Sequence, residues 1–281
     1  MKASPDCYPC FFVQALKTAR LVTQDEKDIE EIVKTVSRSL PNLDFRVTPS
    51  EIGLEVYRTI AEITGIDDPY REVKKECTRQ ALELYPRLKL YISASDDRLL
   101  AAVKVAIAGN VIDFGTSFEF DLESELDAVL CRDFAVDDSE SFLRTLGTAR
   151  NVLYIGDNAG ETVFDRLLIE EMKKPVTYVV REKPIINDAV KEDAIEAGIG
   201  ELASILSSGC AAPSIILEEC SPEFIERFRS ADLVISKGQG NYEGLSDESG
   251  PIFFLLKVKC GVVSRHIGVP QGNIVLMEAK D

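Results

Sequence analysis

Short runs of β-branched and other apolar residues alternate with amphipathic segments throughout the second half of the chain. From Asn151 onward the apolar runs are NVLYIG, VTYVV, SIILEE, DLVIS, FFLLKV and NIVLM, and amphipathic stretches at 161–173, 188–197 and 222–230 separate several of them. This alternation is typical of a mainly parallel sheet covered by helices. We therefore predict an α/β fold with a Rossmann-like, mainly parallel sheet and helices on both of its faces.

The first part of the chain has the spacing of helices. Apolar residues recur at helical intervals in residues 10–21, 25–39, 51–63, 68–94 and 96–108. Thr48-Pro49-Ser50-Glu51 and Asp67-Asp68-Pro69 are plausible helix starts, and Pro86 is expected to kink the long fourth helix.

These patterns divide the chain into three regions. Residues 1–115 are predicted to be mostly helical and to pack on the sheet, and residues 116–150 to be a connecting helix and loop. Residues 151–281 would form the α/β region that binds metal and phosphate.

The charge of the chain excludes several kinds of partner. The formal net charge is -16, so general binding to nucleic acid or to an anionic membrane is not expected, and a bound phosphate needs a local site. There is no apolar run of membrane-spanning length and no signal-peptide pattern, so we expect a cytoplasmic protein. His266 is the single histidine, which excludes a histidine-rich metal site and leaves it a structural or surface role.

Polar turns follow three of the predicted strands. They read Gly156-Asp-Asn-Ala-Gly-Glu161, then Lys183-Pro-Ile-Ile-Asn-Asp-Ala189, then Ser236-Lys-Gly-Gln-Gly-Asn-Tyr-Glu243. In an open α/β sheet, ligands bind beyond the carboxyl ends of the strands. The turns would therefore place Asp157, Asn158 and Asp188 opposite Lys237 in one crevice. Oxygen ligands with one fixed cation suit a hard divalent metal that holds a phosphate.

Each turn also has a structural interpretation. Asp157 and Asn158 could form a plain turn with a side-chain cap, and Asp188 could cap the next helix. Lys237 could be a solvated lysine before a flexible turn, although the glycines that follow it allow backbone and ammonium to approach an anion together. The turns match neither the nucleotide-binding glycine fingerprint nor a Walker A loop.

Two further groups are candidates. Gly109-Asn110-Val111-Ile112-Asp113 ends the helical region, so Asn110 and Asp113 could line the crevice, or could form a helix stop. Cys7-Tyr8-Pro9-Cys10 has the spacing of half a zinc site, for which Cys77 is the expected partner, and a redox role is the alternative. The remaining cysteines are interpreted as buried structural residues, namely Cys131, Cys210, Cys220 and Cys260.

Four of these segments together resemble the motifs of the damage-control phosphatase family, namely GDNAGE (156–161), KPIINDA (183–189), SKGQGNYEGL (236–245) and GNVIDFG (109–115). The segment CYPC (7–10) is similar to the mark of the prokaryotic and archaeal branch of that family. The resemblance implies a metal-dependent phosphatase acting on damaged or surplus phosphometabolites. It implies that Asp157, Asn158 and Asp188 hold the metal and that Lys237 contacts phosphate. Expected substrate contacts are Lys237, Gly238, Asn241, Glu161, Asn110 and Asp113.

The predicted reaction is hydrolysis of phosphomonoesters of small metabolites, with Asp157 and Lys237 as the catalytic residues. Either water or Asp157 could be the nucleophile. The metal could be manganese, nickel, cobalt or magnesium. The alternatives are an S-adenosylmethionine-dependent methyltransferase and a non-catalytic, metal-dependent binder of phosphometabolites. The physiological substrate and the oligomeric state are left open.

Overall fold

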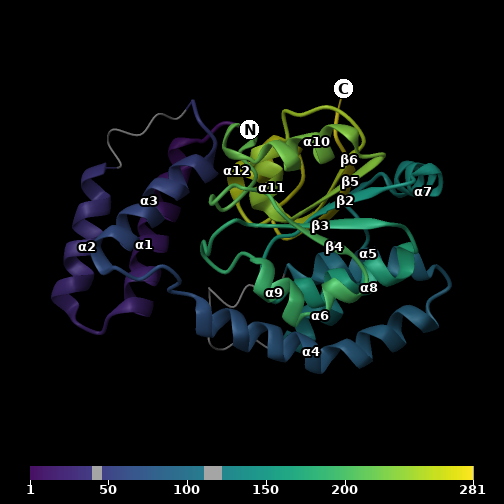
Figure 1. Cartoon of the computed structure of the whole chain (residues 1–281), viewed down its shortest axis with the longest axis horizontal. Helices are drawn as coiled ribbons and strands as arrows, with labels where there is room; N and C mark the ends of the chain where they lie inside the picture. The colour runs from purple at the N-terminus through teal and green to yellow at the C-terminus, as the bar shows by residue number, and fades with distance from the viewer. Residues whose placement is uncertain (40–45, 111–121, 281) are drawn as a thin grey trace.

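A seven-stranded sheet forms the centre of the molecule (Figure 1). The computed structural model describes residues 1–39, 46–110 and 122–280. The strand order is β1-β7-β6-β5-β2-β3-β4, and every neighbouring pair is parallel except β6 with β7. This confirms the predicted mainly parallel sheet. The strands are β1 (Val136–Asp137), β2 (Val152–Ile155), β3 (Val176–Val180), β4 (Ser204–Ser207), β5 (Leu233–Lys237), β6 (Ile252–Lys257) and β7 (Ile274–Glu278).

Helices cover both faces of the sheet because the central strands are apolar on both sides. In β2, Tyr154 joins one apolar cluster, and its neighbours Leu153 and Ile155 join another. The first cluster lies under α4 (Arg71–Ala94), α5 (Arg98–Gly109), α6 (Leu122–Leu130), α7 (Ser139–Thr148), α8 (Thr162–Met172) and α9 (Lys191–Glu196). The second lies under α10 (Pro222–Ser230), α11 (Gly238–Leu245) and α12 (Gly261–Ile267).

The first three helices have an apolar core of their own. They are α1 (Tyr8–Val22), α2 (Glu26–Ser39) and α3 (Pro49–Thr64), and Figure 1 shows them beside the sheet, with α3 nearest to α11. The predicted start of α3 is confirmed: the Thr48 hydroxyl accepts from the Glu51 N–H at 3.3 Å, and Glu51 accepts from the Thr48 N–H at 2.7 Å.

Helix α4 continues through Pro86, as the helical spacing over residues 68–94 predicted. Helices α4 and α5 pack on the sheet with α8, whereas α1, α2 and α3 form the separate bundle. The boundaries near residues 115 and 150 stay a prediction.

The prediction of a strand at SIILEE (214–219) is wrong. The segment is irregular and ends in a short 3-10 helix (Leu217–Glu219), and the strand of this region is β4, upstream. Ile215 and Ile216 are buried in two different apolar clusters. A short apolar run can therefore mark a buried segment that does not pair as a strand.

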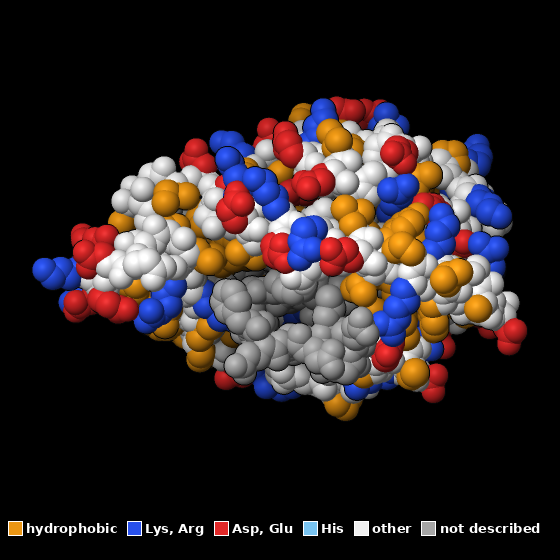
Figure 2. Space-filling model, turned by 90° about the horizontal axis from the view of Figure 1, so that it is seen from below, with side chains coloured by type: hydrophobic (Ala, Val, Ile, Leu, Met, Phe, Trp, Pro, Cys, Tyr) orange, Lys and Arg blue, Asp and Glu red, His pale blue; other side chains and the backbone are white. Residues whose placement is uncertain are grey.

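The surface carries charges of both signs. Figure 2 shows the molecule from the α4 side, where acidic and basic side chains are interspersed with hydrophobic ones. Ion pairs along α4 include Arg79 with Glu76 at 2.6 Å and Lys75 with Glu72 at 3.1 Å. Within the described part of the chain, no helix combines the length and the apolar character that crossing a membrane requires.

Candidate functional site

The loops after β2 and β3 are joined by a short antiparallel bridge. The Ala159 N–H donates to the Asn187 carbonyl at 2.8 Å, and the Ala189 N–H donates to the Asp157 carbonyl at 2.8 Å. Asn158 and Asp188 are the bridge partners. The backbone thus brings the three predicted metal ligands, Asp157, Asn158 and Asp188, together at the carboxyl ends of two neighbouring strands.

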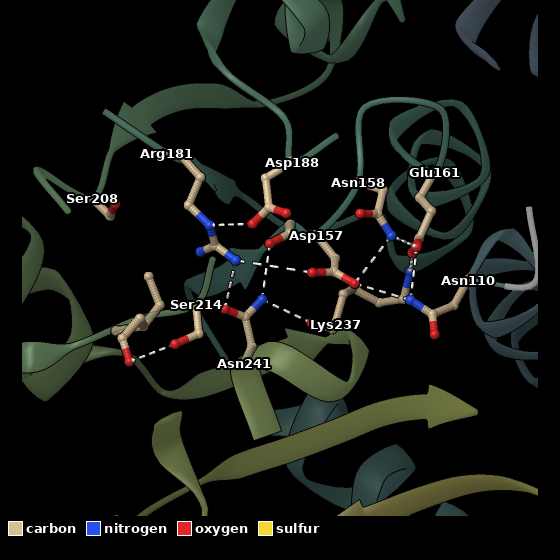
Figure 3. Close-up of polar contacts among 12 residues, drawn as sticks. Asn110, Asp157, Asn158, Glu161, Arg181, Asp188, Ser208, Ser214, Lys237 and Asn241 are labelled. Atoms are coloured by element: carbon tan, nitrogen blue, oxygen red, sulfur yellow. Dashed lines mark hydrogen bonds and ion pairs between the residues drawn. The ribbon is translucent and has the colours of Figure 1, made fainter. Parts of the chain in front are cut away.

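Two amides tie Asp157 to Glu161 (Figure 3). The Asn110 Nδ2 donates to Asp157 Oδ2 at 2.9 Å and to Glu161 Oε1 at 2.7 Å. The Asn158 Nδ2 donates to the same two oxygens at 3.3 and 2.6 Å. Asn110 and Glu161 were predicted as substrate contacts, and the structure places both in this network. Asp113 lies outside the described residues.

Lys237 lies at the end of β5 and is completely buried. Its Nζ donates to Glu161 Oε2 at 3.1 Å and to Asp165 Oδ1 at 2.7 Å. Burial alone would lower the pKa of Lys237, but Asp165 and Glu161 more than offset it, so the pKa is raised and the lysine stays charged. A direct contact of Lys237 with phosphate stays a prediction.

Asp165 is a site residue that the sequence analysis missed. It lies one helical turn after Glu161 and also accepts from the hydroxyls of Tyr154 at 2.7 Å and Tyr178 at 2.8 Å. The four-residue spacing from Glu161 on an amphipathic segment was the available signal, because it places both carboxylates on one helix face.

Arg181, directly after β3, was also missed as a site residue. Its Nε donates to Asp188 at 2.7 Å, and its Nη2 donates to Asn241 at 2.9 Å and lies 3.9 Å from Asp157 Oδ1. Its buried Nη1 has no hydrogen-bond partner among the described residues. Burial alone would lower the pKa of Arg181, but the charges of Asp188 and Asp157 more than offset this effect. The pKa is therefore raised, and the guanidinium remains charged. A buried cation with an unused donor is suited to an anion.

The α11 turn approaches the carboxylates closely. Asn241 donates to the carbonyls of Gly156 at 2.9 Å and Lys237 at 2.8 Å, which fixes the first turn of the helix. Gly238 has φ +78°, and a Cβ there would lie 1.9 Å from Asp157 Oδ2. Only glycine therefore fits at residue 238 while Asp157 keeps its position.

The buried charges in this cluster do not balance. Four buried carboxyl groups face two buried cations, so two negative charges would be in excess with all four ionised; the residues are Asp157, Glu161, Asp165, Asp188, Arg181 and Lys237. Burial, then Glu161 and Asp188, raises the pKa of Asp157 well above its usual value. A divalent cation would neutralise the excess, and carboxylate and amide oxygens are suitable ligands. The donor set therefore fits a divalent metal.

The ligands are not pre-arranged around a cation. Within the described ranges, no three His, Cys, Asp or Glu side chains are positioned together to hold a metal, and the predicted ligand set contains only two such residues, Asp157 and Asp188. Asp188 is engaged by Arg181, and the amide N–H groups of Asn158 face carboxylates. Binding would thus require the Asn158 side chain to present its oxygen.

A cavity of about 470 Å³ lies beside the loop that leads to Asp188. Lys183, Pro184, Ile185 and Ile186 of this loop line it, together with residues of α3 and of the segment before α4. Ile186 has φ +47°, which is rare for a β-branched residue and marks backbone strain next to the site.

The Cys7–Cys10 pair is not completed into a zinc site among the described residues. Cys7 is buried before α1 and Cys10 is exposed in its first turn. Cys77 packs against Gly160 instead, since a Cβ at Gly160 would lie 2.9 Å from its Cβ. Burial raises the pKa of both thiols above its ordinary value.

Comparisons with known proteins cover the whole chain. A profile of the damage-control phosphatase ARMT1-like domain matches residues 3–275. A damage-control phosphatase of Archaeoglobus fulgidus is 38% identical over 98% of both chains, and one of Pyrococcus horikoshii is 36% identical over 100% of this chain and 99% of its own. An uncharacterized protein of Methanocaldococcus jannaschii is 37% identical over 99% of this chain and 96% of its own. The crystal structure of a DUF89 family protein from P. horikoshii aligns with a TM-score of 0.89, at 36% identity and 100% of both chains.

Proposed function

The chain belongs to the family of damage-control phosphatases with the ARMT1-like domain, and from this we propose that it hydrolyses phosphomonoesters of small metabolites with the help of a divalent metal. The observation that carries the proposal is the buried cluster at the carboxyl ends of β2, β3 and β5, which contains two more carboxyl groups than cations. The family relationship supplies the reaction class, and the charge of the cluster supports the need for a divalent cation.

In this proposal Asp157, Asn158 and Asp188 hold the metal. Manganese, nickel, cobalt and magnesium are all compatible with a set of oxygen ligands. When bound, such a metal supplies positive charge to the phosphoryl oxygens and makes a nearby water more acidic.

The residues around the metal ligands position the reactants. Arg181 Nη1 is the unused donor that would contact a phosphoryl oxygen. Lys237 would act chiefly by holding Glu161, and Glu161 with Asn110 fixes Asp157 Oδ2. Asp157 Oδ1 is the less engaged oxygen of that carboxylate. Attack by water and attack by Asp157 are the two versions of the reaction.

The cavity beside residues 183–186 would hold the organic part of the substrate. Its volume of about 470 Å³ suffices for a small metabolite, and it borders the loop that carries Asp188. We therefore propose a small phosphorylated metabolite as the partner. The cytoplasm is kept as the proposed compartment.

The test is hydrolysis of an aryl phosphate by metal-stripped protein after single additions of magnesium, manganese, cobalt or nickel. We expect phosphate release that depends on metal and is lost in Asp157→Ala and Asp188→Ala. Asp193→Ala is the matched control, because Asp193 is a buried carboxylate in the same region that pairs with Lys74, at 3.1 Å, outside the cluster. The control should keep its activity.

Two results would replace the proposal. Metal-dependent binding of phosphometabolites by folded protein, with no turnover under any metal, would favour the non-catalytic binder. Binding of S-adenosylmethionine without metal would favour the methyltransferase. Full activity in folded Asp188→Ala protein would remove Asp188 from the ligand set.

A further inference from the structure

Two cysteines lie in one small apolar cluster in the loop between β4 and α10. Cys210 is buried, and Cys220 is partly exposed and packs against the cluster that contains Cys210. Each thiol has the largest influence on the pKa of the other. The ends of the loop are tied together by the Ser221 N–H, which donates to the Ser208 carbonyl at 2.9 Å. The fold thus holds the two cysteines near each other, with Cys220 partly exposed.

The surroundings of Cys210 favour its thiolate. The Cys220 thiol donates to the Cys210 sulfur, the backbone N–H groups of Ala212 and Ile216 point at it, and the charge of Arg181 acts on it. The hydrogen bond from Cys220 outweighs burial and lowers the pKa of Cys210 to about 6, while the same bond and burial raise the pKa of Cys220. Only a protonated Cys210 could donate to the Ser214 carbonyl, which lies 3.7 Å away.

The loop also adjoins the functional cluster. The Glu182 N–H, next in sequence to Arg181, donates to the Cys210 carbonyl at 3.1 Å. In Figure 3, Ser208 and Ser214, on either side of Cys210 in the sequence, lie on the Arg181 side of the site. A change of charge at Cys210 therefore acts on the guanidinium that holds Asp188.

We propose that Cys210 and Cys220 form a redox-active dithiol that a low-molecular-weight disulfide, such as oxidised glutathione, converts reversibly into an intramolecular disulfide. The Cys220 proton passes to Cys210, and the Cys220 thiolate attacks one sulfur of the small disulfide, releasing one thiolate. Cys210 then loses its proton to solvent and attacks the Cys220 sulfur, which expels the second thiolate. Two protein thiols are oxidised and one small disulfide is reduced to two thiols.

Oxidation removes the negative charge of Cys210 beside Arg181. The guanidinium then has one anion fewer, so an added phosphoryl group should bind more tightly. This consequence rests on the proposed function, whereas formation of the disulfide does not. The two can be tested separately, because the disulfide is detected by its mass.

The test equilibrates the folded, full-length protein in glutathione buffers of increasing oxidised fraction, followed by acid quenching, alkylation and digestion with a glutamyl endopeptidase. The chain between the two cysteines contains Glu218 and Glu219 but no Lys or Arg, so this digestion separates the cysteine peptides unless a disulfide joins them. We expect one joined peptide pair per chain, a loss of these two of the seven thiols, and full recovery with excess reduced glutathione. Cys131→Ser, which replaces an exposed cysteine elsewhere, should oxidise in the same way.

The variant Cys220→Ser should keep Cys210 alkylatable at every glutathione ratio. If Cys210 and Cys220 of the wild-type protein both stay alkylatable in the most oxidising buffer, or if Cys220 stops at a mixed disulfide with glutathione, the dithiol is refuted. A Michaelis constant for aryl phosphate that is lower in the oxidised protein would support the link to Arg181. An unchanged constant beside a mapped disulfide would refute that link alone.

Discussion

Gly238 offers the sharpest test of the site, because one methyl group should displace Asp157 without changing any charge. Its φ of +78° costs an alanine roughly 1–2 kcal/mol in any left-handed position. In addition, the new Cβ would lie 1.9 Å from Asp157 Oδ2, where real contacts stay above 3.0 Å. The carboxylate or the turn must therefore move by at least 1.1 Å, the difference between these two distances.

The chain contains a matched control at Gly268, after α12. Its φ is +82°, and a Cβ there would have no neighbour within 4 Å. Gly268→Ala thus carries the same backbone penalty without the collision. Both variants should lose roughly 1–2 kcal/mol in free energy of unfolding from this penalty, measured by urea denaturation.

Activity should separate the two variants. A misplacement of about 1 Å can reduce turnover about 100-fold, which corresponds to about 2.7 kcal/mol of transition-state stabilisation. We expect kcat/KM for aryl phosphate to fall by about that factor in Gly238→Ala, and metal affinity to fall with it, while Gly268→Ala stays near wild type. Comparable kcat/KM values in the two alanine variants would show that the position of Asp157 does not matter and would refute the reasoning.

Two further predictions concern buried carboxylates. Asp165→Asn breaks the 2.7 Å ion pair with Lys237 and should lower the free energy of unfolding, measured in urea, by about 3–5 kcal/mol. Tyr178→Phe removes only one hydrogen bond to Asp165 and should lower the same free energy by about 1 kcal/mol. Equal losses in the two variants would contradict the importance of the ion pair. Burial raises the pKa of Glu243 from 4.5 to about 7, so the folded protein loses stability as pH rises through that range and the buried carboxyl group ionises. Glu243→Gln, which cannot ionise, should therefore be more stable than wild type above pH 7 by up to about 3 kcal/mol, with no gain below pH 4.5.

Helices and strands with a regular pattern of apolar residues were predictable from the sequence, whereas segments whose structure depends on packing against distant parts of the chain were not. The apolar, β-branched runs at β2, β3 and β5 are short and bounded by turns, so their type followed from composition. The segment at 214–219 has the same composition but is buried without a strand partner, because Ile215 and Ile216 fill two separate clusters. Local sequence does not record which surfaces meet across the fold.

The candidate site shows the same division. Asp157 and Asn158 lie just after β2 and Asp188 lies in the loop after β3, so the neighbouring parallel strands bring the two loops to one edge, where an antiparallel bridge joins them. Arg181 follows β3 and Asp165 is spaced four residues from Glu161, but their roles depend on partners such as Asn241 and Lys237 on distant segments, which local sequence does not indicate. The sequence offered two interpretations of Lys237, a phosphate contact or a solvated lysine, and neither included the two carboxylates that pair with it in the structure.

The excess of negative charge predicts an order of binding. A phosphate anion that approaches Asp157 and Asp188 without a metal meets a cluster that keeps one uncompensated negative charge even when Asp157 is protonated. At an effective dielectric constant of 20, one pair of like charges 4 Å apart costs about 4 kcal/mol, which is roughly a thousandfold in dissociation constant. Inorganic phosphate should therefore bind to metal-stripped protein at least a hundredfold more weakly than to protein with magnesium or manganese, as measured by calorimetry. Equal affinity in both forms would mean that Arg181 alone suffices for the anion and that the carboxylates are already neutralised by protons.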